Sequence, residues 1–148
     1  MTEYDPAEDE ENPVTTLSED ECWELLRAKE FGRLAYHLAG EVHIAPINYA
    51  AHDGTLYFRT AEGSKLLGVV MNSDVAFEVD EITDETAKSV VLRGSARLLE
   101  GDEEHIVEQL PLRPWVNTPK YNIVAITAND GEMRGRSFNL TRPWKKMA

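Results

Sequence analysis

The sequence predicts a small, mainly β protein whose short strands close into an antiparallel barrel. From residue 32 onward, apolar and polar residues alternate with a period of two over several stretches, which is typical of half-buried strands. Turn residues separate these stretches, and long helices do not alternate with them as they would in a parallel α/β sheet. Because so many short strands would leave exposed edges in an open sheet, an antiparallel barrel is the expected arrangement.

A short helix is expected to precede the strands. Ser18 and Glu21 have the spacing of a capping box, in which each side chain accepts a hydrogen bond from the other residue's backbone amide. Apolar residues then recur at helical spacing as far as Phe31, and Gly32 is placed to end the helix. Cys22 belongs to this apolar pattern, so we expect a small buried residue there.

Six to seven strands and two further helices are expected after this first helix. The strands are expected at residues 32–38, 43–51, 55–60, 75–80, 89–99, 121–128 and 132–139, and the helices at residues 63–71 and 103–109. Asp53 and Gly54 predict a tight hairpin turn because both tolerate positive φ. Gly94 lies in the middle of the longest strand, which predicts a bulge or a bend. The last two strands are expected to hinge at residues 129–131.

Length and composition narrow the class of protein. A chain of 148 residues favours one domain, which we expect over residues 14–148. Residues 1–13 carry six acidic side chains and no basic one, so an acidic, disordered tail is expected there. The net charge of −12 disfavours nucleic-acid binding, and no apolar run predicts a membrane span or a signal peptide. We therefore expect a cytoplasmic protein.

Residues 59–65 have the composition of an anion-binding turn. Arg59 and Thr60 end a predicted strand, and Ser64 and Lys65 open a predicted helix after an Ala-Glu-Gly turn. Free amides at a helix start, two hydroxyl groups and a lysine charge together suit a phosphate group. An ordinary strand-to-helix turn, with Ser64 as a helix cap and Lys65 in solvent, explains the same residues equally well.

Other charged residues do not predict a second site. The four histidines, His37, His43, His52 and His105, lack the spacing of a metal site, and no metal is expected. Arg93 and Arg97 alternate with apolar residues on the longest strand. We expect these two arginines to pair with Glu78 or Asp80 across the sheet.

The order of these motifs resembles the pyridoxamine 5′-phosphate oxidase-like family of FMN-binding split barrels, especially its compact nitroimidazole-reductase-like members. The resemblance extends over residues 17–138, and its most specific parts are residues 46–65, the V-A-F-E-V-D run at 75–80 and the L-P-L-R-P-W run at 110–115. It implies a split β-barrel that works as a homodimer, with FMN in a groove between the two subunits.

The resemblance also implies which residues bind the cofactor. They are Asn48, Tyr49, Arg59, Thr60, Ser64, Lys65, Trp115 and Arg136. The residues from 59 to 65 match the phosphate-binding segment of the family, and Asn48 and Tyr49 match the strand against which the flavin ring rests. Trp115 and Arg136 would reach the cofactor of the partner subunit. An apolar plug under the barrel for Trp115, and an exposed strand charge for Arg136, are equally good interpretations.

The chain departs from the oxidase members of the family at several positions. Asn48 stands where they carry a basic residue, Ser89 stands where they carry a glutamine, and their C-terminal Arg-x-His motif is absent. Fewer cationic contacts imply weaker FMN binding, or its replacement by the deazaflavin F420 that some relatives use. Oxidation of pyridoxamine phosphate itself is not expected.

The resemblance implies a flavin-dependent oxidoreductase that transfers a hydride to or from a small planar substrate. Because the cofactor carries this chemistry, no catalytic side chain can be named from the sequence. Three alternatives stay open: an F420-dependent reductase, a flavin-binding carrier without turnover, and a cofactor-free interaction domain that keeps the barrel.

Overall fold

The structure, a computed structural model, describes residues 14–61, 68, 72–110 and 122–140. Its elements are β1 (Val14–Leu17), α2 (Glu19–Ala28), β2 (Phe31–Leu38), β3 (Glu41–His52), β4 (Thr55–Thr60), β5 (Asp74–Ile82), β6 (Thr86–Leu98), the 3-10 helix η1 (Gly101–Gln109) and β7 (Asn122–Asn139). Within the described residues, no helix is both long and apolar enough to cross a membrane.

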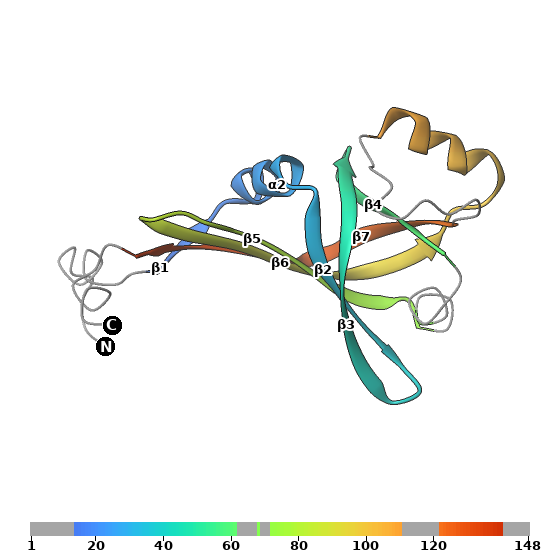
Figure 1. The fold of residues 1–148 in the computed structure, drawn as a ribbon, viewed down its shortest axis with the longest axis horizontal. Coiled ribbons are helices and arrows are strands. Elements are labelled where there is room, and N and C mark those ends of the chain that lie inside the picture. The colour runs from blue at the N-terminus through green and yellow to red at the C-terminus, as the bar shows by residue number, and fades with distance from the viewer. Residues whose placement is uncertain (1–13, 62–67, 69–71, 111–121, 141–148) are drawn as a thin grey trace.

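The seven strands form one antiparallel sheet in the order β1-β7-β4-β3-β2-β5-β6. Strand β6 also pairs with β7, so six of the strands close into a ring, and β1 is added along the second half of β7 (Figure 1). The fold is therefore a split β-barrel, and the prediction of a mainly β, antiparallel barrel is confirmed.

Strand β7 is one strand of 18 residues rather than two, but its pairing is interrupted where the hinge was predicted, since residues 122–128 and 133–139 pair with neighbouring strands. Its partner β6 pairs with it on both sides of the proposed hinge, since Leu92 lies opposite Met133 and Gly94 lies opposite Ala128. Between these two pairs β6 advances by two residues and β7 by five, so the bulge predicted near Gly94 has its extra residues on β7, where Gly131 has a positive φ of 72°. A Cβ at Gly94 would overlap the backbone carbonyl of Thr127, so only glycine fits there.

Helix α2 begins with the predicted capping box. The Glu21 amide donates to Ser18 Oγ at 3.1 Å, and the Ser18 amide donates to Glu21 Oε1 at 2.9 Å. The helix ends at Ala28, earlier than predicted, and Gly32 lies inside β2. Gly32 does not act as a helix stop. It is needed in β2 because a Cβ there would overlap the ring of Phe77.

The core lies between the inner face of the barrel and α2. Helix α2 contributes Cys22, Leu25 and Leu26, and the predicted burial of the cysteine is confirmed at 1% exposure. A smaller cluster lies on the outer face, where Leu110, which follows η1, packs with Ala50, and the partly buried Tyr57 of β4 and Ile106 of η1 pack against this pair. Residues 63–71, predicted as a helix, lie outside the described part of the chain except for Gly68.

Candidate cofactor site

The predicted phosphate-binding turn begins where β4 ends. Thr60 lies opposite Asn122 of β7; its side chain is buried at 6% exposure, and its hydroxyl donates to the Ala61 carbonyl at 3.0 Å. Arg59 alternates with the buried Phe58 and Thr60, which places its half-buried side chain on the outer face of the barrel. Ser64, Lys65 and Trp115 lie outside the described residues.

Asn48 holds the junction between α2 and β2. Its Nδ2 donates a 2.7 Å hydrogen bond to the carbonyl oxygen of Glu30, and the amide of Tyr49 donates to the same oxygen at 2.9 Å. The first of these bonds uses one N–H of the Asn48 side-chain amide. The side-chain oxygen of Asn48 is the acceptor that this residue can offer to a ligand. The Asn48 side chain alternates with the buried Ile47 and Tyr49, so it lies on the same outer face as Arg59.

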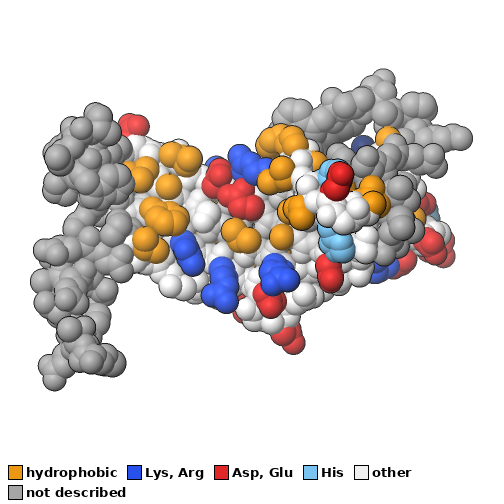
Figure 2. All heavy atoms as spheres, turned by 90° about the horizontal axis from the view of Figure 1, so that it is seen from below, with side chains coloured by type: hydrophobic (Ala, Val, Ile, Leu, Met, Phe, Trp, Pro, Cys, Tyr) orange, Lys and Arg blue, Asp and Glu red, His pale blue; other side chains and the backbone are white. Residues whose placement is uncertain are grey.

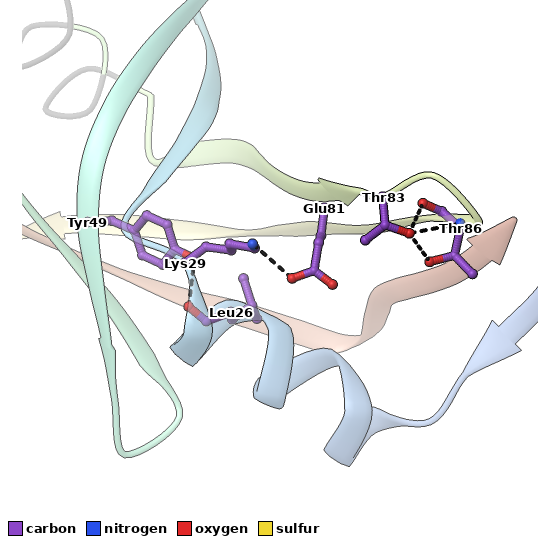
Figure 3. A network of polar contacts seen from close by, with 6 residues as sticks. All are labelled: Leu26, Lys29, Tyr49, Glu81, Thr83 and Thr86. Carbon is purple, nitrogen blue, oxygen red and sulfur yellow. Dashed lines mark hydrogen bonds and ion pairs between the residues drawn. The ribbon is translucent and has the colours of Figure 1, made fainter. Parts of the chain in front are cut away.

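Tyr49 belongs to the core rather than to the surface of the site. Its side chain is 1% exposed, packs edge-on against Phe77 at 4.8 Å, and donates from Oη to the Leu26 carbonyl at 2.6 Å (Figure 3). Burial raises the pKa of this phenol, so the hydroxyl stays protonated. The expected side-chain contact between Tyr49 and a flavin ring does not fit this position, because strand alternation turns Tyr49 inward from Asn48.

Arg136 of β7 lies far along that strand from the residue that is opposite Arg59 of β4. Arg59 is opposite Ile123, whereas Arg136 is opposite Thr16 of β1 and Ser89 of β6. The β6 partners of Val124 and Arg136 are Leu98 and Ser89, nine positions apart, which corresponds to roughly 30 Å of extended strand. One chain therefore does not bring Arg136 together with Arg59, and a second copy would have to supply it to a shared site.

The pairing register brings together a row of three side chains that the sequence did not predict as a group. Phe31 is opposite Asn48, and the Tyr49–Phe58 pair places Asn48 next to Arg59. All three point to the outer face, since their strand neighbours are buried. Sequence reasoning missed Phe31 because its spacing fitted the apolar face of the preceding helix; only the pairing with β3 identifies it as a strand residue.

An ion cluster lies beside this row on the outer face. Arg33 Nη1 is 2.9 Å from Glu78 Oε1 and 3.2 Å from Asp80 Oδ2. Burial raises the pKa of the Glu78 carboxyl, and the hydrogen bond from Arg33 opposes part of this shift. The predicted pairing of these two carboxylates with Arg93 or Arg97 is wrong, because Arg33 is directly opposite Glu78 and Arg97 instead pairs with Glu103 at 2.8 Å.

His43 points to the face of β3 opposite that of Asn48. Its ring stacks on Tyr36 at 5.1 Å, and its Nε2 is 3.8 Å from a carboxylate oxygen of Glu41. The alternation along β3 separates it from the face that carries Asn48. His43 is therefore a structural residue of the β2–β3 hairpin.

Several large hydrophobic side chains are exposed on the outer face of the sheet. Those of the described residues are Phe31, Val42, Ile44, Ile82 and Val91. Each alternates with inward-facing residues of β2, β3, β5 or β6, so all five lie on the outer face. Viewed from the side opposite α2, the molecule shows hydrophobic side chains interspersed with charged ones (Figure 2).

Comparisons with known proteins agree with this architecture. A family profile described as pyridoxamine 5′-phosphate oxidase matches residues 18–142. A Corynebacterium glutamicum structure provisionally named pyridoxamine 5′-phosphate oxidase is 42% identical, with a TM-score of 0.79 over 88% of this chain and 97% of that one.

Two similar solved structures are described as FAD-binding proteins. The one from Mycobacterium smegmatis is 36% identical, with a TM-score of 0.73 over 84% of this chain and 98% of that chain. The one from Mesorhizobium loti is 27% identical, with a TM-score of 0.71 over 84% of this chain and 97% of that chain. The match over residues 18–142 and the closed split barrel together show that this chain belongs to the pyridoxamine 5′-phosphate oxidase-like family.

Proposed function

We propose that the protein binds a flavin nucleotide on the outer face of β2, β3 and β4 and acts as a flavin-dependent oxidoreductase on a small planar substrate. The observation that carries the proposal is the adjacency of Asn48 and Arg59 at the start of the predicted phosphate-binding segment. An amide acceptor and a guanidinium group on neighbouring strands suit the polar ring edge and the anionic tail of such a ligand.

The described residues fit this ligand by their chemistry. Arg59 would neutralise a phosphate and donate charge-assisted hydrogen bonds to it. The side-chain oxygen of Asn48 would accept a hydrogen bond from a ring N–H. The hydrogen bond from Asn48 Nδ2 to the Glu30 carbonyl keeps the amide in a fixed orientation. The bound flavin supplies hydride transfer, so the protein's part is to bind, orient and shield the ring.

The identity of the flavin follows from which phosphate groups the site accepts. FMN and FAD share the ring and the first phosphate, so Asn48, Arg59, Thr60, Ser64 and Lys65 would serve either one. The FAD-binding relatives support a flavin over F420. We infer FMN as the minimal ligand, with FAD as the larger form that the same residues would accept.

A homodimer is the second part of the proposal. Exposed hydrophobic side chains on a single face are a common mark of a protein–protein contact. A second copy would cover this face by two-fold symmetry and would complete the cofactor groove. Arg136 of the partner subunit, and Trp115 from its chain, are the residues that we propose would reach the ligand from the other side.

The test is the absorption spectrum of the purified protein, followed by release of its cofactor and identification by mass. The stripped protein is then titrated with FMN, FAD and F420, with heat stability as a second readout, since a ligand of the native state raises stability. We expect Arg59→Ala and Lys65→Ala to weaken flavin binding at least about tenfold, which corresponds to about 1.4 kcal/mol. Arg27→Ala, an exposed arginine on α2, is the matched control.

Two outcomes would contradict the proposal at different levels. A protein that neither carries a flavin nor gains heat stability from one is not a flavoprotein, which favours the cofactor-free domain. A holoprotein that is not reduced by NADH, NADPH or reduced F420 in stopped-flow mixing binds flavin without turnover, which favours the carrier.

A further inference from the structure

Phe31 is the one aromatic side chain among the exposed large hydrophobic residues that the structure describes. Its side chain is 44% exposed at the start of β2. Two hydrogen bonds to the carbonyl oxygen of the preceding Glu30, from Asn48 Nδ2 and from the Tyr49 amide, hold the backbone there. An exposed aromatic ring on an anchored backbone is a prepared contact surface, because little conformational freedom is lost when a ligand packs against it.

The place of Phe31 in the sheet sets it apart from the other exposed hydrophobic residues. It lies opposite Asn48, which in turn neighbours Arg59, so the row crosses β2, β3 and β4 on one face. Two strand spacings separate the first Cα of the row from the last, which is about 10 Å. This span is comparable with a fused three-ring system, with an apolar group at one end, an amide in the middle and a cation at the other end.

We propose that the ring of Phe31 packs against the ring system of the bound flavin and is a specificity-determining residue for planar ligands; this rests on the proposed flavin function. Arg59 draws the anionic tail towards the end of β4, and the ring then extends over Asn48 towards β2. Phe31 supplies the apolar contact at that end, where a polar residue would leave the ring against water.

Substitutions at position 31 can distinguish an aromatic contact with the flavin from simple burial of apolar area. Leucine at position 31 keeps most of the apolar area but removes the ring. Tyrosine keeps the ring, and an exposed site tolerates its hydroxyl. Tryptophan keeps an aromatic face and adds a group that quenches flavin fluorescence when the two rings are in contact.

The experiment compares FMN binding to the wild-type protein with binding to Phe31→Leu, Phe31→Tyr and Phe31→Trp. We expect Phe31→Leu to raise the dissociation constant about three- to tenfold, as the loss of one aromatic contact implies. Phe31→Tyr should restore the wild-type value, and Phe31→Trp should quench the fluorescence of bound FMN below the wild-type level. Equal affinity of Phe31→Leu and wild type, or no added quenching in the Phe31→Trp variant, would overturn the inference.

A second measurement separates a ligand contact from a subunit contact. Val91→Ala removes an exposed apolar group from the same face but from β6. If Phe31 only touches a second copy, Phe31→Leu and Val91→Ala should both weaken the dimer in sedimentation. FMN affinity should then be unchanged at protein concentrations high enough to keep the dimer assembled. With this result the inference fails and the proposed function stands. A wild-type protein that binds neither FMN nor FAD would overturn the proposed function, and this inference with it.

Discussion

The hydroxyl of Tyr49 donates a 2.6 Å hydrogen bond to the backbone carbonyl oxygen of Leu26 and so joins β3 to the last turn of α2. The carbonyls of the last helical turn have no partner within the helix. The Leu25 carbonyl accepts from the Lys29 amide, and the Leu26 carbonyl accepts from Tyr49. The side chain that the family resemblance assigned to the flavin ring is thus part of the helix–barrel junction.

Tyr49→Phe is expected to lower the free energy of unfolding by about 1–2 kcal/mol, because it leaves the buried Leu26 carbonyl without its hydrogen bond. Urea denaturation measures this loss. FMN affinity, measured in the same preparations, should stay within about twofold of the wild-type value, since the hydroxyl faces the core. A variant with wild-type stability and weakened FMN binding would show that Tyr49 acts on the ligand.

Gly94→Ala is expected to destabilise the protein by more than about 2 kcal/mol, because the new methyl group would overlap the Thr127 carbonyl across the bulge. Ser95→Ala is the matched control: its side chain is exposed one residue away, and the change should stay within about 0.5 kcal/mol. Thermal unfolding followed by circular dichroism checks both variants. A tolerated alanine at position 94 would mean that the two strands separate there.

The elements that local signals define were predicted well. Strand β4 was predicted with both of its ends, because turn residues flank it and Asp53 and Gly54 take the positive φ values of 50° and 77° that a tight hairpin needs. The capping box likewise placed the start of α2. These signals lie within a few residues of the structure that they determine.

The elements that depend on distant partners were missed or misplaced. Strand β1 has only four residues; three of them are β-branched and suit a strand, but their partners, residues 135–138 of β7, lie far away in the sequence. Phe31 continues the helical apolar pattern, but pairing with Asn48 draws it into β2. At Phe31 the tertiary contact outweighs the local helical pattern.

The candidate site was also predicted only where local signals define it. Asn48 and Arg59 could be placed on neighbouring strands from the hairpin between them, and the register confirms that placement. The inward position of Tyr49 follows from strand alternation, whereas the family resemblance indicates only the strand as a whole. The distance of Arg136 from Arg59 depends on β6 pairing with both halves of β7 and so keeping them in line, which the turn-like residues 129–131 do not indicate.

Acid should weaken the cap of α2. The hydrogen bond from the Ser18 backbone amide, followed by the interaction with the Ser18 side chain, lowers the pKa of the Glu21 carboxyl below the ordinary value of 4.5. A carboxyl whose pKa is lower in the folded state stabilises the fold above the unfolded value, and this contribution is lost as the pH falls through the folded value. Glu21→Gln should therefore be less stable than wild type at pH 7 and equal to it near pH 3, as urea denaturation at several pH values can show. A constant difference across this range would exclude the charge effect.

The contribution of Glu78 to stability should depend on pH in the opposite sense. Burial raises the pKa of its carboxyl above 4.5 despite the hydrogen bond from Arg33, so the ionised form is disfavoured in the folded protein. The resulting cost is present above the raised pKa and disappears as the pH falls below the unfolded value. Glu78→Gln, which keeps an acceptor for Arg33, should match or exceed wild-type stability at pH 7 and lose this advantage towards pH 3. A variant that is less stable at pH 7 would show that the ion pair with Arg33 outweighs burial.

The tip of the β2–β3 hairpin offers the sharpest test of the dimer. Val42 and Ile44 are 83% and 72% exposed on the outer face, and the hairpin extends away from the rest of the barrel (Figure 1). Burying one such side chain contributes about 1.5–3 kcal/mol, and a two-fold interface buries it twice. Ile44→Asp would instead place two carboxylates in that contact.

If the wild-type protein is a dimer, as we propose, Ile44→Asp is expected to sediment as a folded monomer at the same concentration. Ala28→Asp, which adds the same charge at an exposed position on α2, is the matched control and should leave the dimer intact. If the flavin lies between subunits, the monomeric variant should also bind FMN more weakly, although residue 44 is four positions along β3 from Asn48. A monomer that retained wild-type FMN affinity would place the whole cofactor site within one chain and would remove Arg136 and Trp115 of the second copy from it.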